Sequence, residues 1–246
     1  MAEGEELVTR YKTIKLYGIS ADEVKNQIQD MEGRETPKIK IEPHDAETHI
    51  IISAAAESEE EALTLIKPFS REIKKRFGNA IYSTRENETI EMAVVRLLEK
   101  YELTVSTAES CTGGLLAGRL INVPGVSDVF KEGFISYSNK AKRKTLDVSR
   151  GTLKKYGAVS KQTAKEMATG AVFAADADTS VSVTGIAGPD GGTDKKPVGL
   201  CYIGCYMKDK VTVEEFHFTG DRMQIREQAV NAALNLLRKL ILENYK

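Results

Sequence analysis

The chain has 246 residues, of which 41% are hydrophobic and 29% charged, and its formal net charge is −1. This composition is typical of a soluble globular protein, and the length suffices for two domains. The longest apolar runs fall far short of the roughly 20 residues of a membrane span, and the near-neutral charge gives no overall attraction to nucleic acid. The opening MAEGEELVTRYK lacks the basic and apolar regions of a secretory signal. We therefore expect a cytoplasmic protein with no membrane contact.

The cysteines argue against a disulfide framework and against a structural zinc site. There are three, Cys111, Cys201 and Cys205, and no two form a C-x-x-C pair. Cys201 and Cys205 lie in an apolar, strand-like run, so we expect both to be buried.

Residues 13–83 predict the order strand, helix, strand, strand, helix, strand. TIKLYG is the first strand, and the first helix begins after an N-cap at Ser20. KIKIEPHDAETHIIISA predicts a hairpin with its turn through His44 and Asp45.

The second helix of this region carries the capping-box signature that starts at Ser58, and it contains Pro68, where we expect a bend. The element order predicts a small α+β domain of the split βαβ, ferredoxin-like type over residues 1–86. The charged stretch STRENET separates this domain from the next.

Residues 87–246 alternate between helical and β-rich segments. The helix TIEMAVVRLLEKYE precedes the strand LTVSTAES, a helix to about Asn122, the strand EGFISYS and the short basic helix NKAKRKTLDV. A longer helix follows the N-cap Ser160, and TSVSVTG leads into the glycine-rich loop IAGPDGGTDKKPVG. Two β-rich runs and a helix from about Asp221 complete the chain. This alternation predicts an α/β sandwich with a central mixed sheet.

Three polar segments follow predicted strands: AESCTGG, YSNKAK and TGIAGPDGGT. Ligands of open α/β sheets bind where the carboxyl ends of the strands meet, so these segments predict a site at one sheet edge. The helix after Gly114 is expected to offer free N–H groups to an anion or oxyanion. Glycine-rich turns that only connect elements are the alternative for any single loop.

Standard catalytic motifs do not fit this edge. A G-x-S-x-G elbow would need glycine where the chain has Ala108 and Thr112, and neither a Walker A nor a Rossmann string occurs. The second domain has one histidine, His217, in a strand-like run where a structural role is expected. We therefore predict neither a histidine-based triad nor a metal site.

Without a histidine, a nucleophile at residues 110–112 needs another base, and a desolvated lysine is the available one. A lysine normally has a pKa of about 10.4, so burial or a neighbouring cation would have to lower it. A solvated basic helix is the alternative for this segment. The candidate groups in YSNKAKRK are Tyr137, Lys140, Lys142, Arg143 and Lys144.

The second domain resembles the C-terminal domain of the CinA family of competence/damage-inducible proteins, which is similar to the PncC nicotinamide-nucleotide amidohydrolases. The resemblance covers roughly residues 88–246, and residues 8–85 resemble the KH-type middle region of CinA proteins. The sequence has no counterpart of the molybdopterin-binding-like N-terminal domain, so its ADP-ribose pyrophosphatase activity is not expected. The matching segments are TAESCTGG, VPGVSDVFKEGFISYSNKAK, AVSKQTAKEMATGA, VTGIAGPDGGTDKKPVG and FTGDRMQIREQAV.

This resemblance implies hydrolysis of nicotinamide mononucleotide to nicotinate mononucleotide and ammonia, with no metal and no cofactor. Ser110 would be the nucleophile, Tyr137 and Lys142 the proton-transfer group, and Lys140 a neighbour that helps lower the Lys142 pKa. Cys111 would be a neighbour of the nucleophile that takes no part in catalysis.

Arg222 is the candidate phosphate contact, because its planar fork matches phosphate geometry; a surface ion pair is the alternative. The other residues expected to line the site are Glu109, Thr112, Gly113, Gly114, Asn139, Thr184, Gly185, Gly188, Pro189, Asp190, Gly191 and Gly192.

Two other functions stay open at this point. The chain could be a non-catalytic binding or regulatory module of competence or damage response, or a pocket that binds a nucleotide without turnover. Nucleic acid is not an expected partner, because a KH clamp needs a G-x-x-G loop and residues 8–85 contain none. We expect a homo-oligomer, either a dimer or a trimer.

Overall fold

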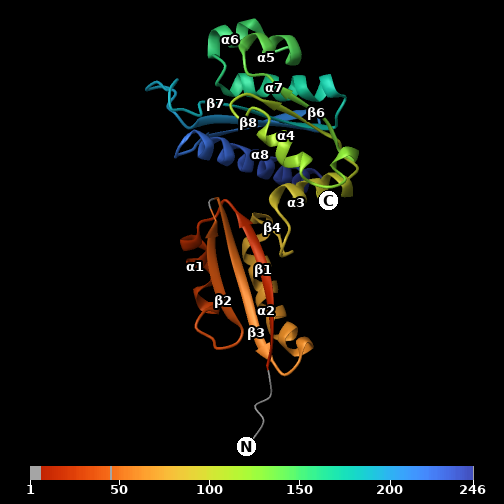
Figure 1. Cartoon of the computed structure of the whole chain (residues 1–246), viewed down its shortest axis with the longest axis vertical. Coiled ribbons are helices and arrows are strands. Elements are labelled where there is room, and N and C mark those ends of the chain that lie inside the picture. Colours follow the sequence, from red (N-terminus) through yellow and green to blue (C-terminus); the bar gives the residue numbers. More distant parts are fainter. Residues whose placement is uncertain (1–6, 45, 246) are drawn as a thin grey trace, which may run out of the picture. The chain divides into compact units, whose positions relative to one another are not determined.

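The computed structural model describes residues 7–44 and 46–245, and Figure 1 shows the course of the chain. The chain divides into two compact units between Thr89 and Ile90. Asp45, which we expected in the hairpin turn, lies outside the described residues. None of the described helices is long and apolar enough to cross a membrane.

The first unit is built on a four-stranded antiparallel sheet in the order β2-β3-β1-β4. The predicted element order is confirmed, although the first strand begins at Val8 rather than at Thr13. Strand order and connections are those of the split βαβ arrangement. The elements are β1 (Val8–Tyr17), α1 (Ala21–Ile28), β2 (Lys38–His44), β3 (Glu47–Ala56), α2 (Glu59–Phe77) and β4 (Ile81–Ser83).

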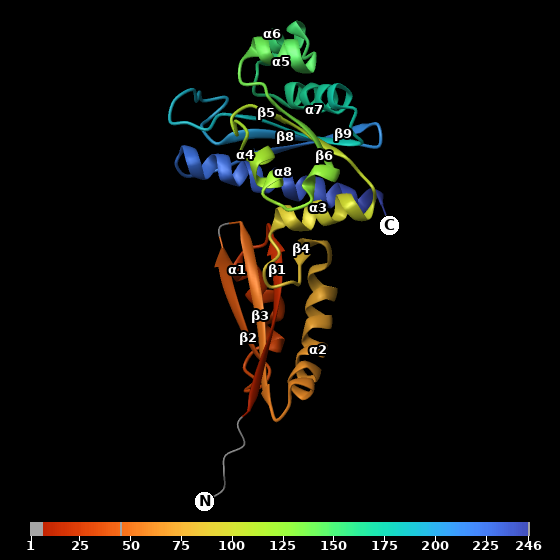
Figure 2. The same ribbon diagram turned by 45° about the vertical axis from the view of Figure 1, so that its right-hand side comes forward.

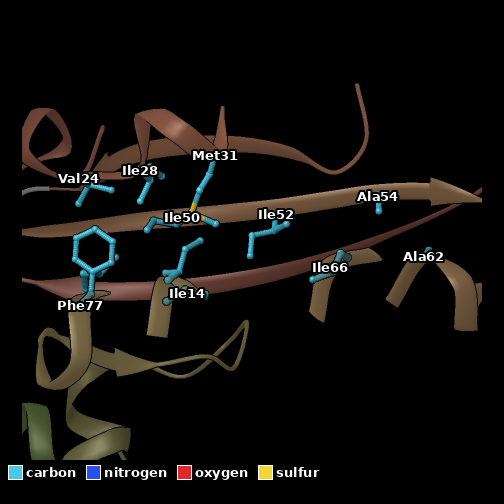
Figure 3. Close-up of a cluster of buried hydrophobic side chains, with 12 residues drawn as sticks. Ile14, Val24, Ile28, Met31, Ile50, Ile52, Ala54, Ala62, Ile66 and Phe77 are labelled. Carbon is cyan, nitrogen blue, oxygen red and sulfur yellow. The ribbon is translucent and has the colours of Figure 1, made fainter. Parts of the chain in front are cut away.

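Both helices of the first unit pack on the same face of this sheet. Alternate residues of β3, including Ile50 and Ile52, point into one hydrophobic cluster, as expected of a strand with one buried face. Val24 of α1 and Phe77 of α2 join that cluster (Figure 3). Helix α2 continues through Pro68 as one helix.

The second unit is an α/β sandwich around a five-stranded mixed sheet in the order β6-β5-β7-β8-β9. Helices α5, α6 and α7 lie on one side of the sheet, and α3, α4 and α8 on the other (Figure 2). The elements are α3 (Ile90–Lys100), β5 (Val105–Glu109), α4 (Leu115–Ile121), β6 (Phe130–Ile135), α5 (Asn139–Leu146), α6 (Arg150–Tyr156), α7 (Lys161–Ala175), β7 (Thr179–Gly185), β8 (Leu200–Met207), β9 (Lys210–His217) and α8 (Arg222–Asn244).

Two segments of the second unit differ from the sequence prediction. Strand β6 ends at Ile135: the Ser136 N–H still donates to the Glu109 carbonyl of β5, but the chain then turns into α5, which Ser138 caps. Helix α6 was not predicted, since none of its residues is buried and the segment therefore lacks a helical apolar period.

Strands β6, β5 and β7 are parallel neighbours, which brings their carboxyl ends together. Glu109, the last residue of β5, lies opposite Ile135 of β6 and Val183 of β7. The three polar segments therefore leave the sheet at one edge, as predicted.

Candidate active site

Ser110 stands directly after β5, in a tight turn that leads into α4. All five residues of β5 are buried, and the Ser110 N–H donates to the Val183 carbonyl at 3.0 Å, so the serine is fixed to the centre of the sheet. Gly113 and Gly114 have φ values of 60° and 97°, in the left-handed region that favours glycine. These two residues let the chain reverse from strand to helix within a few residues.

The Glu109 carboxylate caps the N-terminus of α4. It accepts hydrogen bonds from the N–H groups of Gly114, Leu116 and Ala117 at 2.8 to 3.1 Å, and its side chain is buried. The expectations that the α4 amides face a ligand and that Glu109 binds substrate are therefore wrong. A carboxylate of the chain itself already occupies this positive helix end.

Lys142 and Ser110 form the centre of the site. Lys142 lies on the first turn of α5, which begins after the N-cap Ser138. Its Nζ donates to Ser110 Oγ at 2.8 Å and to the Ser136 carbonyl at 2.8 Å. The Lys142 side chain is fully buried, and Ser110 is 8% exposed.

Burial lowers the pKa of Lys142 to about 8, because the charged ammonium loses its hydration. The other cations of this helix, Lys140, Arg143 and Lys144, are exposed. Among the basic residues of this helix, only Lys142 turns inward. Lys140 does not lower the Lys142 pKa as expected, since burial alone is responsible.

Cys111 lies beside this pair and is 6% exposed. The Cys201 thiol donates a hydrogen bond to the Cys111 sulfur, and this lowers the pKa of the Cys111 thiol. Burial raises that pKa, whereas the N–H groups of Cys111 and Thr112 and the positive charge of Lys142 lower it further. The Lys142 amine nevertheless donates to the Ser110 hydroxyl. Cys201 and Cys205 are fully buried, as predicted.

Tyr137 and Arg222 lie together at the rim of the site. Arg222 Nη1 donates to the Gly188 carbonyl at 2.6 Å, and its Nη2 donates to the Tyr137 hydroxyl at 3.3 Å. The Tyr137 side chain is 62% exposed. Among the described residues, its hydroxyl bonds to Arg222 and to neither Ser110 nor Lys142, so a proton relay through Tyr137 stays a prediction.

The remaining predicted residues fall into three groups. The Thr184 hydroxyl donates to the Ala158 carbonyl and is fully buried, so it is not free for a ligand as expected. The Thr112 hydroxyl is buried and has no hydrogen-bond partner among the described residues. The other expected residues lie at the carboxyl ends of β6 and β7. Gly185 packs against Cys201, and Gly188 is buried. The exposed ones are Asn139, Pro189, Asp190, Gly191 and Gly192.

Arg226 of α8 belongs to the site, although the sequence did not single it out. Its Nε donates to the Cys111 carbonyl at 3.0 Å and its Nη2 to the Thr112 carbonyl at 2.8 Å. The sequence holds only a weak signal for this contact, because both acceptors are backbone atoms more than a hundred residues away.

The described residues contain no group of three or more histidine, cysteine or acidic side chains arranged to hold a metal ion. His217 ends β9 and pairs with Glu215 at 2.9 Å.

Two protein families match the chain in sequence. The CinA C-terminal domain matches residues 87–241, and the KH domain of the damage-inducible protein CinA matches residues 11–83. A competence-damage inducible protein of Clostridium beijerinckii is 45% identical over 244 residues, which are 99% of this chain and 59% of that protein. A CinA-like protein of Kosmotoga olearia is 44% identical over 94% of this chain and 56% of its own length. The chain thus spans somewhat more than half the length of these relatives.

Solved structures match over a smaller part of the chain. The competence/damage inducible protein CihA of Agrobacterium tumefaciens is 43% identical with a TM-score of 0.60, and the match covers 61% of this chain and 93% of that one. A CinA superfamily protein of Escherichia coli is 37% identical with a TM-score of 0.59, over 66% of this chain and 98% of its own.

Proposed function

The chain belongs to the CinA family, and from this premise we propose that its second unit is a metal-independent amidase that converts nicotinamide mononucleotide to nicotinate mononucleotide and ammonia. The observation that carries the proposal is the buried Lys142 amine, 2.8 Å from the hydroxyl of Ser110. A buried amine of lowered pKa that contacts a hydroxyl is the pairing by which a serine is activated without histidine.

In the first half of the reaction, neutral Lys142 accepts the proton of the Ser110 hydroxyl while Oγ attacks the carboxamide carbon. The carbonyl oxygen becomes an oxyanion. The C–N bond then breaks, and Lys142 returns the proton to the leaving nitrogen, which departs as ammonia. The product of this half is an ester between Ser110 and the nicotinoyl group.

In the second half, Lys142 takes a proton from a water molecule that attacks the ester carbon. The bond to Ser110 Oγ breaks, the serine regains its proton, and nicotinate mononucleotide leaves. The Ser136 carbonyl accepts a hydrogen bond from Nζ, so it holds the amine in place through both proton transfers.

Substrate recognition is assigned to the rim of the site in this proposal. Arg222, which ties Gly188 to Tyr137, would contact the substrate phosphate through its guanidinium. The 188–192 loop would lie along the ribose and phosphate.

The test is ammonia release from nicotinamide mononucleotide by the purified chain. Ser110→Ala and Lys142→Ala should each lower kcat by about 10³-fold or more, because they act as one unit. Lys140→Ala, at an exposed lysine of the same helix, is the matched control and should retain activity. Cys111→Ala should also stay active.

Three results would contradict the proposal: no ammonia from the wild type, undiminished release from Ser110→Ala, or a folded but inactive Cys111→Ala. Calorimetric binding of the mononucleotide without ammonia release would instead favour a nucleotide-binding module.

A further inference from the structure

Arg226 places its guanidinium on two consecutive carbonyl groups of the nucleophile turn. Nε and Nη2 bind the carbonyl oxygens of Cys111 and Thr112, as a planar fork can. The other contact of this guanidinium within the described residues runs from Nη1 to the sulfur of Met223, at 4.0 Å. The oxygen atoms that Arg226 contacts are therefore the two carbonyl oxygens of this turn.

These contacts fix the direction of two N–H groups. The two peptide bonds that follow Cys111 and Thr112 are trans, since the cis bonds of the described chain precede Pro37 and Pro189. In a planar trans peptide the C=O and N–H bonds point in opposite directions. The N–H groups of Thr112 and Gly113 therefore point away from Arg226.

The base approaches the turn from the side opposite Arg226. Arg226 reaches the turn from α8, whereas Lys142 reaches Ser110 from α5, in the helical layer on the other side of the sheet (Figure 2). Neither the Thr112 nor the Gly113 N–H donates to an oxygen of the described residues, and the Thr112 N–H interacts with the sulfur of Cys111, whose pKa it helps to lower. The lowered pKa of the neighbouring Cys111 thiol, to which Cys201, the backbone N–H groups and Lys142 contribute, agrees with a local preference for negative charge.

Four other amides near Ser110 already have oxygen acceptors. Glu109 takes those of Gly114, Leu116 and Ala117, and the Ser110 N–H bonds to the Val183 carbonyl. Because Gly113 is free to adopt other φ values, the peptide between Thr112 and Gly113 could otherwise turn its carbonyl towards the substrate.

We propose that Arg226 is a positioning residue that forms the oxyanion hole: it holds the carbonyls of Cys111 and Thr112 so that the N–H groups of Thr112 and Gly113 receive the oxyanion. This inference rests on the proposed amidase function. The guanidinium charge also polarises both peptide groups, which strengthens their N–H donors.

The test compares Arg226→Gln and Arg226→Lys with the wild-type full chain. Losing aligned oxyanion donors should lower kcat by about 10²-fold with little change in KM. Arg226→Lys should recover part of that loss, because an ammonium can still hold one carbonyl. Circular dichroism and thermal unfolding check that each variant is folded.

A second readout separates positioning from general structural support. Pyridine-3-boronic acid forms an anionic tetrahedral adduct with an active serine, so its binding should weaken in Arg226→Gln by about the same factor as kcat. Binding of nicotinate mononucleotide, which carries no tetrahedral oxyanion, should not change. Gln228→Ala is the matched control, because Gln228 also donates to two backbone carbonyls from α8, those of Thr219 and Gln224.

The inference is overturned if Arg226→Gln keeps kcat within about threefold, or if it weakens boronate and product equally. If the wild type releases no ammonia, the amidase proposal fails. The boronate comparison still decides the role of Arg226 in that case, because adduct formation needs the serine and the amides but no turnover.

Discussion

Lys142 determines how the proposed reaction should depend on pH. The lysine must be neutral to accept the Ser110 proton, and with a pKa of about 8 roughly a tenth of it is neutral at pH 7. We expect kcat/KM to rise about tenfold per pH unit below pH 8 and to level off above it. Initial rates of ammonia release from pH 6 to pH 9.5 measure this profile.

The control for this profile is the unfolding transition of the wild type at each pH, which shows that the protein stays folded throughout. A rate that is constant across the range, or that falls as the pH rises, would contradict a lysine base.

The residues of the site differ in how far the sequence could predict them. Ser110 and Lys142 could be predicted because the proposed chemistry is carried by their side chains, which lie in recognisable segments. Which lysine turns inward depended on the resemblance, since the charge pattern of the helix equally fits a solvated face. Glu109 and Arg226 bind backbone N–H and carbonyl groups. Every residue has these groups, so the sequence does not show which ones are the partners.

Among the elements, α5 is held in place by its close packing on α7. A methyl group on Gly170 of α7 would overlap the Leu146 carbonyl at the end of α5. Because this carbonyl belongs to the backbone, it cannot move aside as a flexible side chain could. Gly170→Ala should therefore push α5 outward, lower the free energy of unfolding by about 1–3 kcal/mol and lower kcat by displacing Lys142. Urea unfolding and ammonia release measure the two effects.

Gly118→Ala in α4 is the matched control. Gly118 is also helical, but nothing lies within 4 Å of the position of an added methyl group. The helix preference of alanine over glycine should stabilise the protein by up to about 1 kcal/mol there. Equal effects of the two substitutions would refute the packing argument.

Helices and strands were predicted correctly where burial of one face gives the sequence a regular spacing of apolar residues, and they were missed where no such spacing exists. Strand β7 and the N-caps of α7 and α8 coincide with the prediction, because β7 is buried along its length and Ser160 and Asp221 bond their helices. Helix α6 has no buried face to reveal it. The end of β6 was misjudged because ISYS has strand-like residues, although its last residues turn towards the N-cap of α5 at Ser138.

At the scale of the whole molecule, the order of elements follows from the sequence except for α6, and so does the sheet edge at which the candidate site lies. The strand order of the second unit does not, because it depends on pairings between segments far apart in the chain. The first unit has the four-stranded antiparallel sheet of a split βαβ domain, and its sequence lacks the G-x-x-G loop of a nucleic-acid clamp. Its fold alone assigns no role.

The proposed chemistry requires only the second unit, since every residue assigned to it lies between Glu109 and Arg226. The matched structures from A. tumefaciens and E. coli cover 61% and 66% of this chain and nearly all of their own, a share that fits this unit alone. A chain of residues 87–246 should therefore fold and keep kcat/KM within about threefold of the full chain. Ammonia release by both chains, with circular dichroism to verify folding, measures this. A folded second unit with kcat/KM lowered more than about tenfold would show that the first unit contributes to the site, its substrate access or its assembly.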